Sequence, residues 1–192
     1  MLTTEERLFD WTQAFASPPA AAIAGLSAAA LLAGWIAYWA LSRVRRWPRE
    51  TLAEFRRRLR GWTALAPARV GAALLGAIWV FAAVAALSLA CYLEFARLTG
   101  LVRERAISLV VIAGILLVSF ACLDHWIGLF ALATPLAAAA LLVAAVLPDQ
   151  PEGFTRRVAL GFSAFVFFGI GLGHLGYLAN DEEYRPMLLM LM

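Results

Sequence analysis

Residues 106–147 read AISLVVIAGILLVSFACLDHWIGLFALATPLAAAALLVAAVL, which is two long apolar runs separated by two polar residues, Asp124 and His125. The runs, at about 106–123 and 126–147, contain no charged side chain. A helix needs about 20 predominantly apolar residues to cross the hydrocarbon core of a bilayer. This stretch therefore predicts two transmembrane helices joined by a tight hairpin. The proline inside the second run is compatible with a membrane helix whose neighbours satisfy the freed carbonyl.

More apolar runs lie on both sides of this hairpin. Three of them are also long enough to cross a bilayer, at about 20–41, 70–92 and 158–178. A last apolar run, 187–192, is too short to cross, and we interpret it as the beginning of a span in a chain that continues beyond it. The predicted fold is all-α and multi-pass transmembrane, with about five complete spans plus the start of a sixth.

Composition agrees with a membrane protein and excludes other classes. Of the 192 residues, 63% are hydrophobic and 15% are charged, whereas a soluble domain is about half apolar and a quarter charged. Disorder is excluded too, because it needs low hydrophobicity and high charge. The 16 basic residues are all arginine, and they lie beside the predicted spans. This placement argues against a nucleic-acid partner, and the lack of lysine excludes catalysis by lysine within the chain.

The N-terminal residues 1–19 form a predicted interfacial segment ahead of the transmembrane domain, 20–192. Within this segment Leu8, Trp11 and Phe15 repeat at helical spacing, which indicates an amphipathic helix lying in the membrane interface. It is not a signal peptide, because it carries acidic residues where a signal peptide needs positive charge.

A second amphipathic segment, at about 50–64, follows the first span. Its large apolar residues fall on one helical face, at Leu52, Phe55, Leu59 and Trp62. Arginines lie mostly off that face, so the segment is predicted to be a basic helix on the membrane surface. This loop carries the most arginine, and the positive-inside rule therefore predicts that it faces the cytoplasm and that the N-terminus faces outside. We expect the protein in the inner membrane of a cell.

Four arginines of this basic helix are candidate contacts for lipid headgroups: Arg56, Arg57, Arg58 and Arg60. Each arginine near an anionic leaflet attracts acidic lipid by about 1 kcal/mol. Topology explains the same residues, because positive charge alone holds a loop in the cytoplasm. The two roles can coexist, and the sequence does not separate them.

Ionisable residues within or beside the spans are candidate functional groups. His174 lies inside the span at 158–178, where an ionisable side chain is a functional candidate, but a neutral histidine bonded to a neighbouring helix is an equal interpretation. Glu94 closes the span at 70–92 and forms either a routine helical pair with Arg97 or a carboxylate that holds a neighbouring helix.

The polar pair at the hairpin and the small residues are interpreted structurally. Asp124 and His125 are favoured as a polar hairpin tip over a proton relay or ion site. A G-x-G-x-x-G pattern inside the span at 158–178 is favoured as a helix-packing surface over a nucleotide site. Cys91 and Cys122 are interpreted as buried apolar residues. The sequence contains no nucleophile motif, P-loop or zinc site, so no catalytic and no metal-binding residue is assigned.

Four short stretches, in this order, resemble the N-terminal half of the phosphatidate cytidylyltransferase (CDP-diacylglycerol synthase) family. They are Arg58-Leu59-Arg60-Gly61-Trp62, Leu93-Glu94-Phe95-Ala96-Arg97-Leu98-Thr99, Trp126-Ile127-Gly128-Leu129-Phe130 followed by Pro135, and Gly173-His174-Leu175. Together they cover most of residues 50–180, and their order and spacing carry the resemblance. The Glu-Phe segment is the most specific of the four.

The resemblance implies a nucleotidyltransferase of phospholipid biosynthesis that joins CTP to phosphatidate, giving CDP-diacylglycerol and pyrophosphate. The family's catalytic residues and its Mg²⁺ lie in the C-terminal half, so the resemblance assigns none to this chain, and we expect the chain alone to be inactive and to bind no cofactor. Membrane lipids, phosphatidate and CTP are the implied partners, and a homo-oligomer is left open. The alternative is a non-enzymatic small multi-pass membrane protein, such as a transporter subunit or an assembly factor.

Overall fold

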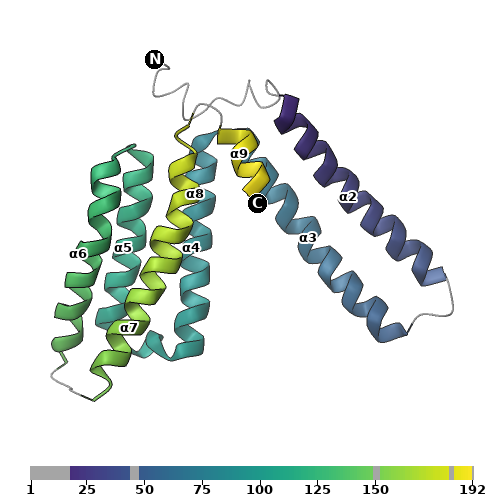
Figure 1. The fold of residues 1–192 in the computed structure, drawn as a ribbon. Helices are drawn as coiled ribbons and strands as arrows, with labels where there is room; N and C mark the ends of the chain where they lie inside the picture. The colour runs from purple at the N-terminus through teal and green to yellow at the C-terminus, as the bar shows by residue number, and fades with distance from the viewer. Residues whose placement is uncertain (1–17, 44–47, 149–151, 182–183, 192) are drawn as a thin grey trace. The chain divides into compact units, whose positions relative to one another are not determined.

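The computed structural model describes residues 18–43, 48–148, 152–181 and 184–191 (Figure 1). Within these ranges the chain is helical with no strand, and five helices are long and apolar enough to cross a membrane. Their bounds are Pro18–Arg43, Ala77–Thr99, Arg105–Leu123, Ile127–Val146 and Phe154–Leu178. The predicted all-α multi-pass fold is therefore confirmed, whereas the interfacial segment at 1–19 lies, up to residue 17, outside the described residues.

The chain divides into two compact units, which are described separately. The first, Met1–Ala77 with Glu183–Met192, is here called the hairpin unit, and the second, Ile78–Glu182, the bundle unit. Long helices in both units leave large apolar side chains exposed, such as Leu26 and Leu109. Helices that cross a membrane expose such side chains to lipid, so this exposure agrees with the composition.

The hairpin unit consists of α2 (Pro18–Arg43), α3 (Arg49–Leu75) and the short α9 (Tyr184–Leu191). Pro18 and Pro19, the last residues of the predicted interfacial segment, instead begin α2, since proline is favoured in the first turn of a helix, where its missing N–H costs nothing. Helices α2 and α3 run antiparallel, side by side (Figure 1). The start of the predicted sixth span forms α9, which packs on both.

The basic helix is longer than predicted. Helix α3 continues past residue 64 and through Pro67, and it ends at Gly76, whose φ of 125° suits only glycine. The next span, α4 (Ala77–Thr99), starts after this break rather than at about residue 70. The different boundary has a local cause. Pro67 is accommodated inside α3, whereas the backbone conformation at Gly76 cannot continue a helix.

The bundle unit contains α4, the short η1 (Leu101–Arg103), α5 (Arg105–Leu123) and α6 (Ile127–Val146). The last spanning helix, here called the last rod, consists of α7 (Phe154–Ala164), the π-helical segment η2 (Phe165–Gly171) and α8 (Leu172–Leu178). Helices α5 and α6 form the predicted tight hairpin, and His125 makes the turn with a φ of 55°. Pro135 lies inside α6 as expected.

The glycines of the last rod pack against α5, as the sequence indicates. A Cβ on Gly173 would stand 2.5 Å from Val118 Cγ1, and one on Gly169 would stand 3.6 Å from Ile115 Cγ1. The pattern is therefore a helix-packing surface. Cys122 is buried beside it and Cys91 is partly buried, and neither thiol is in a disulfide.

Candidate functional site

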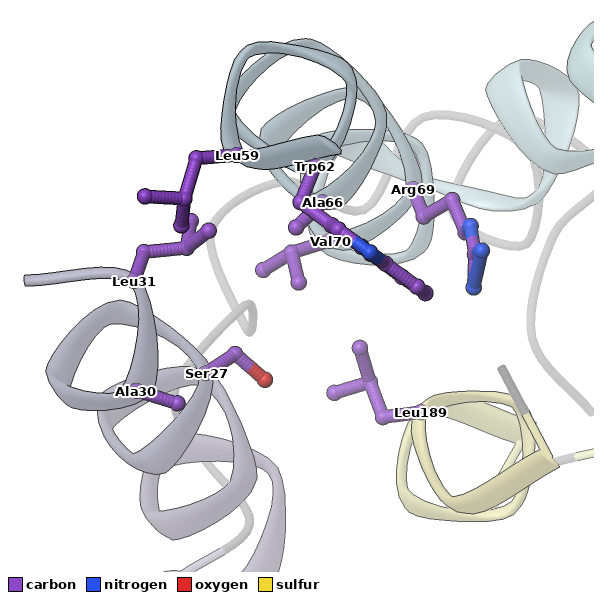
Figure 2. Close-up of a pocket in the computed structure, with 9 residues that line it drawn as sticks. All are labelled: Ser27, Ala30, Leu31, Leu59, Trp62, Ala66, Arg69, Val70 and Leu189. Carbon is purple, nitrogen blue, oxygen red and sulfur yellow. The ribbon is translucent and has the colours of Figure 1, made fainter. Parts of the chain in front are cut away.

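A groove of about 330 Å³ in the hairpin unit is the candidate site (Figure 2). Its volume is at the lower end of the range for small-molecule sites. Helix α2 contributes Ser27, Ala30 and Leu31, and α9 contributes Leu189. Helix α3 contributes five residues with helical spacing, which are Leu59, Trp62, Ala66, Arg69 and Val70. Most of the wall is apolar, and Arg69 is its one charged residue among those described.

Arg69 and Trp62 stand together on the α3 side of the groove. They are two turns apart, and the Arg69 guanidinium carbon lies 5.5 Å from the centre of the Trp62 ring. Figure 2 shows both side chains extending from α3 into the space between the helices, with Leu189 facing them. A cation over an aromatic face is a favourable arrangement, and it gives the planar guanidinium a defined orientation.

Close contacts between α2 and α3 hold the groove's walls. The Trp35 indole N–H donates a hydrogen bond to Thr63 Oγ1 at 2.9 Å, and the Thr63 hydroxyl in turn donates to the Leu59 carbonyl at 2.7 Å. The Tyr38 and Phe55 rings lie 6.4 Å apart between the same helices. The groove is thus formed by a braced helical hairpin.

The end of the groove near α9 is closed by small residues. Ala20 and Ala73 are fully buried and form a cluster with Leu189, against which Ile23 and Val70 pack. Because alanine allows helix backbones to approach closely, the three helices converge here. The Ser27 hydroxyl donates to the Ile23 carbonyl at 2.8 Å, so its proton is used within α2.

The four predicted arginines of α3 are all exposed, and they do not share one side of the helix. Arg58 is eleven residues before Arg69, which is about three turns, so the two lie on the same side. Arg57 points to the opposite side of α3 from the groove, at 100° per residue. Arg58 donates to Glu54 Oε1 at 2.6 Å. Helix geometry therefore associates Arg58, but not Arg57, with the groove side.

The two other predicted residues lie in the bundle unit, apart from this groove. Glu94 is exposed and accepts a bond of 3.0 Å from Arg97 within α4. His174 is exposed, and its Nδ1 lies 2.7 Å from the Ile170 carbonyl oxygen, one turn earlier. A carbonyl only accepts, so Nδ1 carries the proton in this bond. Its ring meets Phe130 edge-on, with the ring centres 5.0 Å apart.

The tip of the hairpin between α5 and α6 is polar and braced. The His125 ring stacks on Tyr177, with ring centres 5.5 Å apart. The Asn180 side-chain amide donates to the Cys122 carbonyl at 2.8 Å, close to the end of α5. Neither Tyr177 nor Asn180 is identifiable from the sequence, because the residues they contact, His125 and Cys122, are distant in the chain.

Sequence reasoning also missed Arg69 and Trp62 as a pair. The sequence predicts Trp62 on the apolar face of a helix that ends at about residue 64, five residues before Arg69. The available signal is their spacing of seven residues, which places two side chains on the same side of a helix. This signal holds only if the helix continues through Pro67.

The groove has the chemistry of a binding site. It offers apolar walls, one guanidinium and one indole N–H, which can hold a ligand with an apolar part and an anionic part. Among the described residues, no group of three or more His, Cys, Asp or Glu side chains is placed to hold a metal ion. No protein-family model, no curated protein and no solved structure matches the chain.

Proposed function

We propose that this chain is the N-terminal membrane part of a phosphatidate cytidylyltransferase-like enzyme, and that its hairpin unit binds phosphatidate. The observation that carries this proposal is the groove between α2 and α3, which sets Arg69 and Trp62 on an otherwise apolar wall. The four sequence stretches that resemble this family also support it, and the first of them contains Leu59 and Trp62 of the groove.

The groove matches both parts of a phospholipid. An acyl chain gains by leaving water for an apolar wall, at about 25 cal/mol for each Å² of apolar surface buried. A guanidinium forms paired hydrogen bonds with two phosphate oxygens, whereas a compact ammonium group does not have this planar pair of donors. Tryptophan and tyrosine are enriched at the boundary between the hydrocarbon core and the headgroups. Trp62 beside Arg69 therefore suits a site for the phosphate end of a lipid.

The exposed arginines of α3 have a separate role in the proposal. They attract acidic lipid from the leaflet without fixing its orientation, because exposed charges act over the screening length rather than by contact. We propose that the loop that carries them faces the cytoplasm of the inner membrane, with the N-terminus outside. Phosphatidate would then be gathered on the side where CTP is found.

The catalytic step belongs, by the family resemblance, to the C-terminal half with its Mg²⁺. The hairpin unit holds the lipid substrate, and the chain alone makes no CDP-diacylglycerol. A site for this reaction should also bind the product, because phosphatidate and CDP-diacylglycerol share the diacylglycerol and the phosphate attached to it. Diacylglycerol lacks that phosphate and should bind poorly.

The test is lipid binding by the purified chain in phosphatidylcholine nanodiscs containing a photoactivatable phosphatidate. We expect labelling of the hairpin unit that CDP-diacylglycerol reduces and diacylglycerol does not. Arg69→Gln should weaken labelling about tenfold, because hydrogen bonds to a charged group contribute about 1.5–3 kcal/mol. Arg103→Gln is the control, since it removes the same charge from an exposed position of the bundle unit. Equal labelling of both variants, or equal competition by diacylglycerol, would overturn the proposal.

A further inference from the structure

A second cavity, of about 400 Å³, lies in the bundle unit and is polar. It is placed where four spanning helices begin or end. The residues after α4 contribute Gly100, Leu101 and Glu104, and the start of α7 contributes Glu152, Gly153, Arg156 and Arg157, with Thr99 and Leu160 completing the wall. The ends of spanning helices stand at the level of the lipid headgroups.

Arg157 is the fixed element of this cavity. It is 8% exposed, and its Nη1 donates to the Glu152 carbonyl at 3.0 Å. Its Nη2 donates to the Ala145 carbonyl at 3.4 Å, and its Nε lies 4.0 Å from Glu104 Oε2. A buried guanidinium is costly unless it is bonded. These contacts therefore hold the start of α7, the end of α6 and the Glu104 carboxylate in one arrangement.

Arg156 provides the accessible cation of the same cavity. It is exposed, and its Nη2 donates to the Thr99 carbonyl at 3.3 Å, which places the guanidinium across the opening between α7 and the end of α4. On the anionic side, the Glu104 side chain is 35% exposed and Glu152 is exposed. Accessible positive and negative groups thus face one small space.

This balance of charge selects the ligand. An anion would meet Glu104 and Glu152, and a cation would meet Arg156, so either one alone is opposed by part of the wall. A zwitterion can satisfy both sides. We propose that the cavity binds a zwitterionic lipid headgroup, the phosphoethanolamine of phosphatidylethanolamine, with its phosphate at Arg156 and its ammonium at the two carboxylates.

The ammonium end distinguishes this headgroup from phosphocholine. A primary ammonium has three N–H donors for carboxylate oxygens, whereas a quaternary choline has none. Proteins recognise quaternary ammonium with aromatic side chains. The residues that line this cavity include none of Phe, Tyr or Trp. The site is independent of the phosphatidate groove, and it gives the bundle unit its own lipid preference.

The test uses the whole chain in nanodiscs that contain equal amounts of phosphatidylethanolamine and phosphatidylcholine, with the retained lipids measured by native mass spectrometry. We expect enrichment of phosphatidylethanolamine that falls about tenfold in Glu152→Gln and in Arg156→Gln, since each loses a charge-assisted contact. Arg103→Gln is the matched control, because Arg103 is exposed nearby and does not line the cavity.

Further arms separate the lipid from its soluble headgroup and from the proposed function. Free O-phosphoethanolamine should compete only at high concentration, because it lacks the membrane anchor. Displacement by the free headgroup at a concentration equal to that of the lipid would overturn the assignment to a lipid. Equal retention of both lipids, or unchanged enrichment in Glu152→Gln, would overturn the site. Phosphatidate labelling of the same samples reports on the hairpin unit alone, so failure of either proposal is distinguishable from failure of the other.

Discussion

Gly173 of α8 lies so close to Val118 of α5 that a Cβ on the glycine would stand 2.5 Å from Val118 Cγ1 and 3.3 Å from Phe130 Cε2. Val118 is 1% exposed, and its branched side chain has little rotational freedom. The neighbour therefore cannot move aside. The contact fixes the distance between the last rod and the hairpin of α5 and α6.

We predict that Gly173→Ala destabilises the bundle unit by about 1–3 kcal/mol, the usual cost of overpacking a well-packed core. Reversible unfolding in mixed detergent micelles, followed by circular dichroism, measures the change. Gly25→Ala is the control, because a Cβ there meets nothing within 4 Å. That variant should be neutral or slightly stabilising, since alanine favours a helix over glycine. A fully stable Gly173→Ala protein would contradict the packing.

A second prediction concerns the bond between Trp35 and Thr63, 2.9 Å long, which joins α2 to α3. Thr63→Val keeps the shape and removes the acceptor, so the indole N–H loses its partner. We expect a loss of about 0.5–1.5 kcal/mol, the net contribution of a typical hydrogen bond, because the site is exposed and water can reach the freed donor. Thr63→Ser keeps the hydroxyl and should stay close to the wild type. Tryptophan fluorescence during unfolding reports on the contact directly, and equal stability of the two variants would argue against it.

The spans were predictable because each depends only on its own composition. The runs at 106–123 and 126–147 are apolar throughout, and the two polar residues between them leave room only for a hairpin. The extent of α3 was not predictable in the same way. Pro67 is a strong local signal for a break, yet the break occurs at Gly76, whose positive φ is accessible to glycine and ends the helix.

Both cavities were beyond sequence reasoning for a different physical reason. Each depends on residues that are distant in the chain and meet only after packing. Glu104 comes directly before α5 and Arg157 lies in the first turn of α7, and each is an ordinary charged residue beside a span until the other is placed next to it. In the sequence, Arg156 is one of 16 arginines that lie beside the predicted spans. The resemblance to a family did not identify either cavity.

A third prediction separates the two adjacent arginines of the bundle unit. Arg157→Gln should destabilise the unit by about 2 kcal/mol, because two carbonyls lose a charged donor in a buried position. Arg156→Gln should change the stability by less than about 0.5 kcal/mol, since its bond is exposed. Arg157→Lys should not rescue the loss, because an ammonium cannot reproduce the planar set of donors. Similar unfolding curves for Arg156→Gln and Arg157→Gln would contradict the assigned roles.

The last prediction separates two effects in the hairpin unit, the general attraction of anionic lipids and the preference for phosphatidate. Replacing the exposed arginines Arg56, Arg57, Arg58 and Arg60 together by Gln should reduce the retention of phosphatidate and of phosphatidylglycerol from nanodiscs by a similar factor, because each contributes about 1 kcal/mol to the attraction of any anionic lipid. Arg69→Gln should instead abolish the preference for phosphatidate. A phosphate monoester carries more negative charge and one more free oxygen than a diester, and a guanidinium in contact with the phosphate responds to both differences.

Added salt should reduce the effect of the quadruple variant more than the effect of Arg69→Gln, since exposed charges are screened. Native mass spectrometry of the lipids retained from nanodiscs at two salt concentrations measures the retention of phosphatidate and of phosphatidylglycerol by each variant. A quadruple variant that loses the preference, with Arg69→Gln retaining it, would place lipid selection on the surface of α3 instead of in the groove.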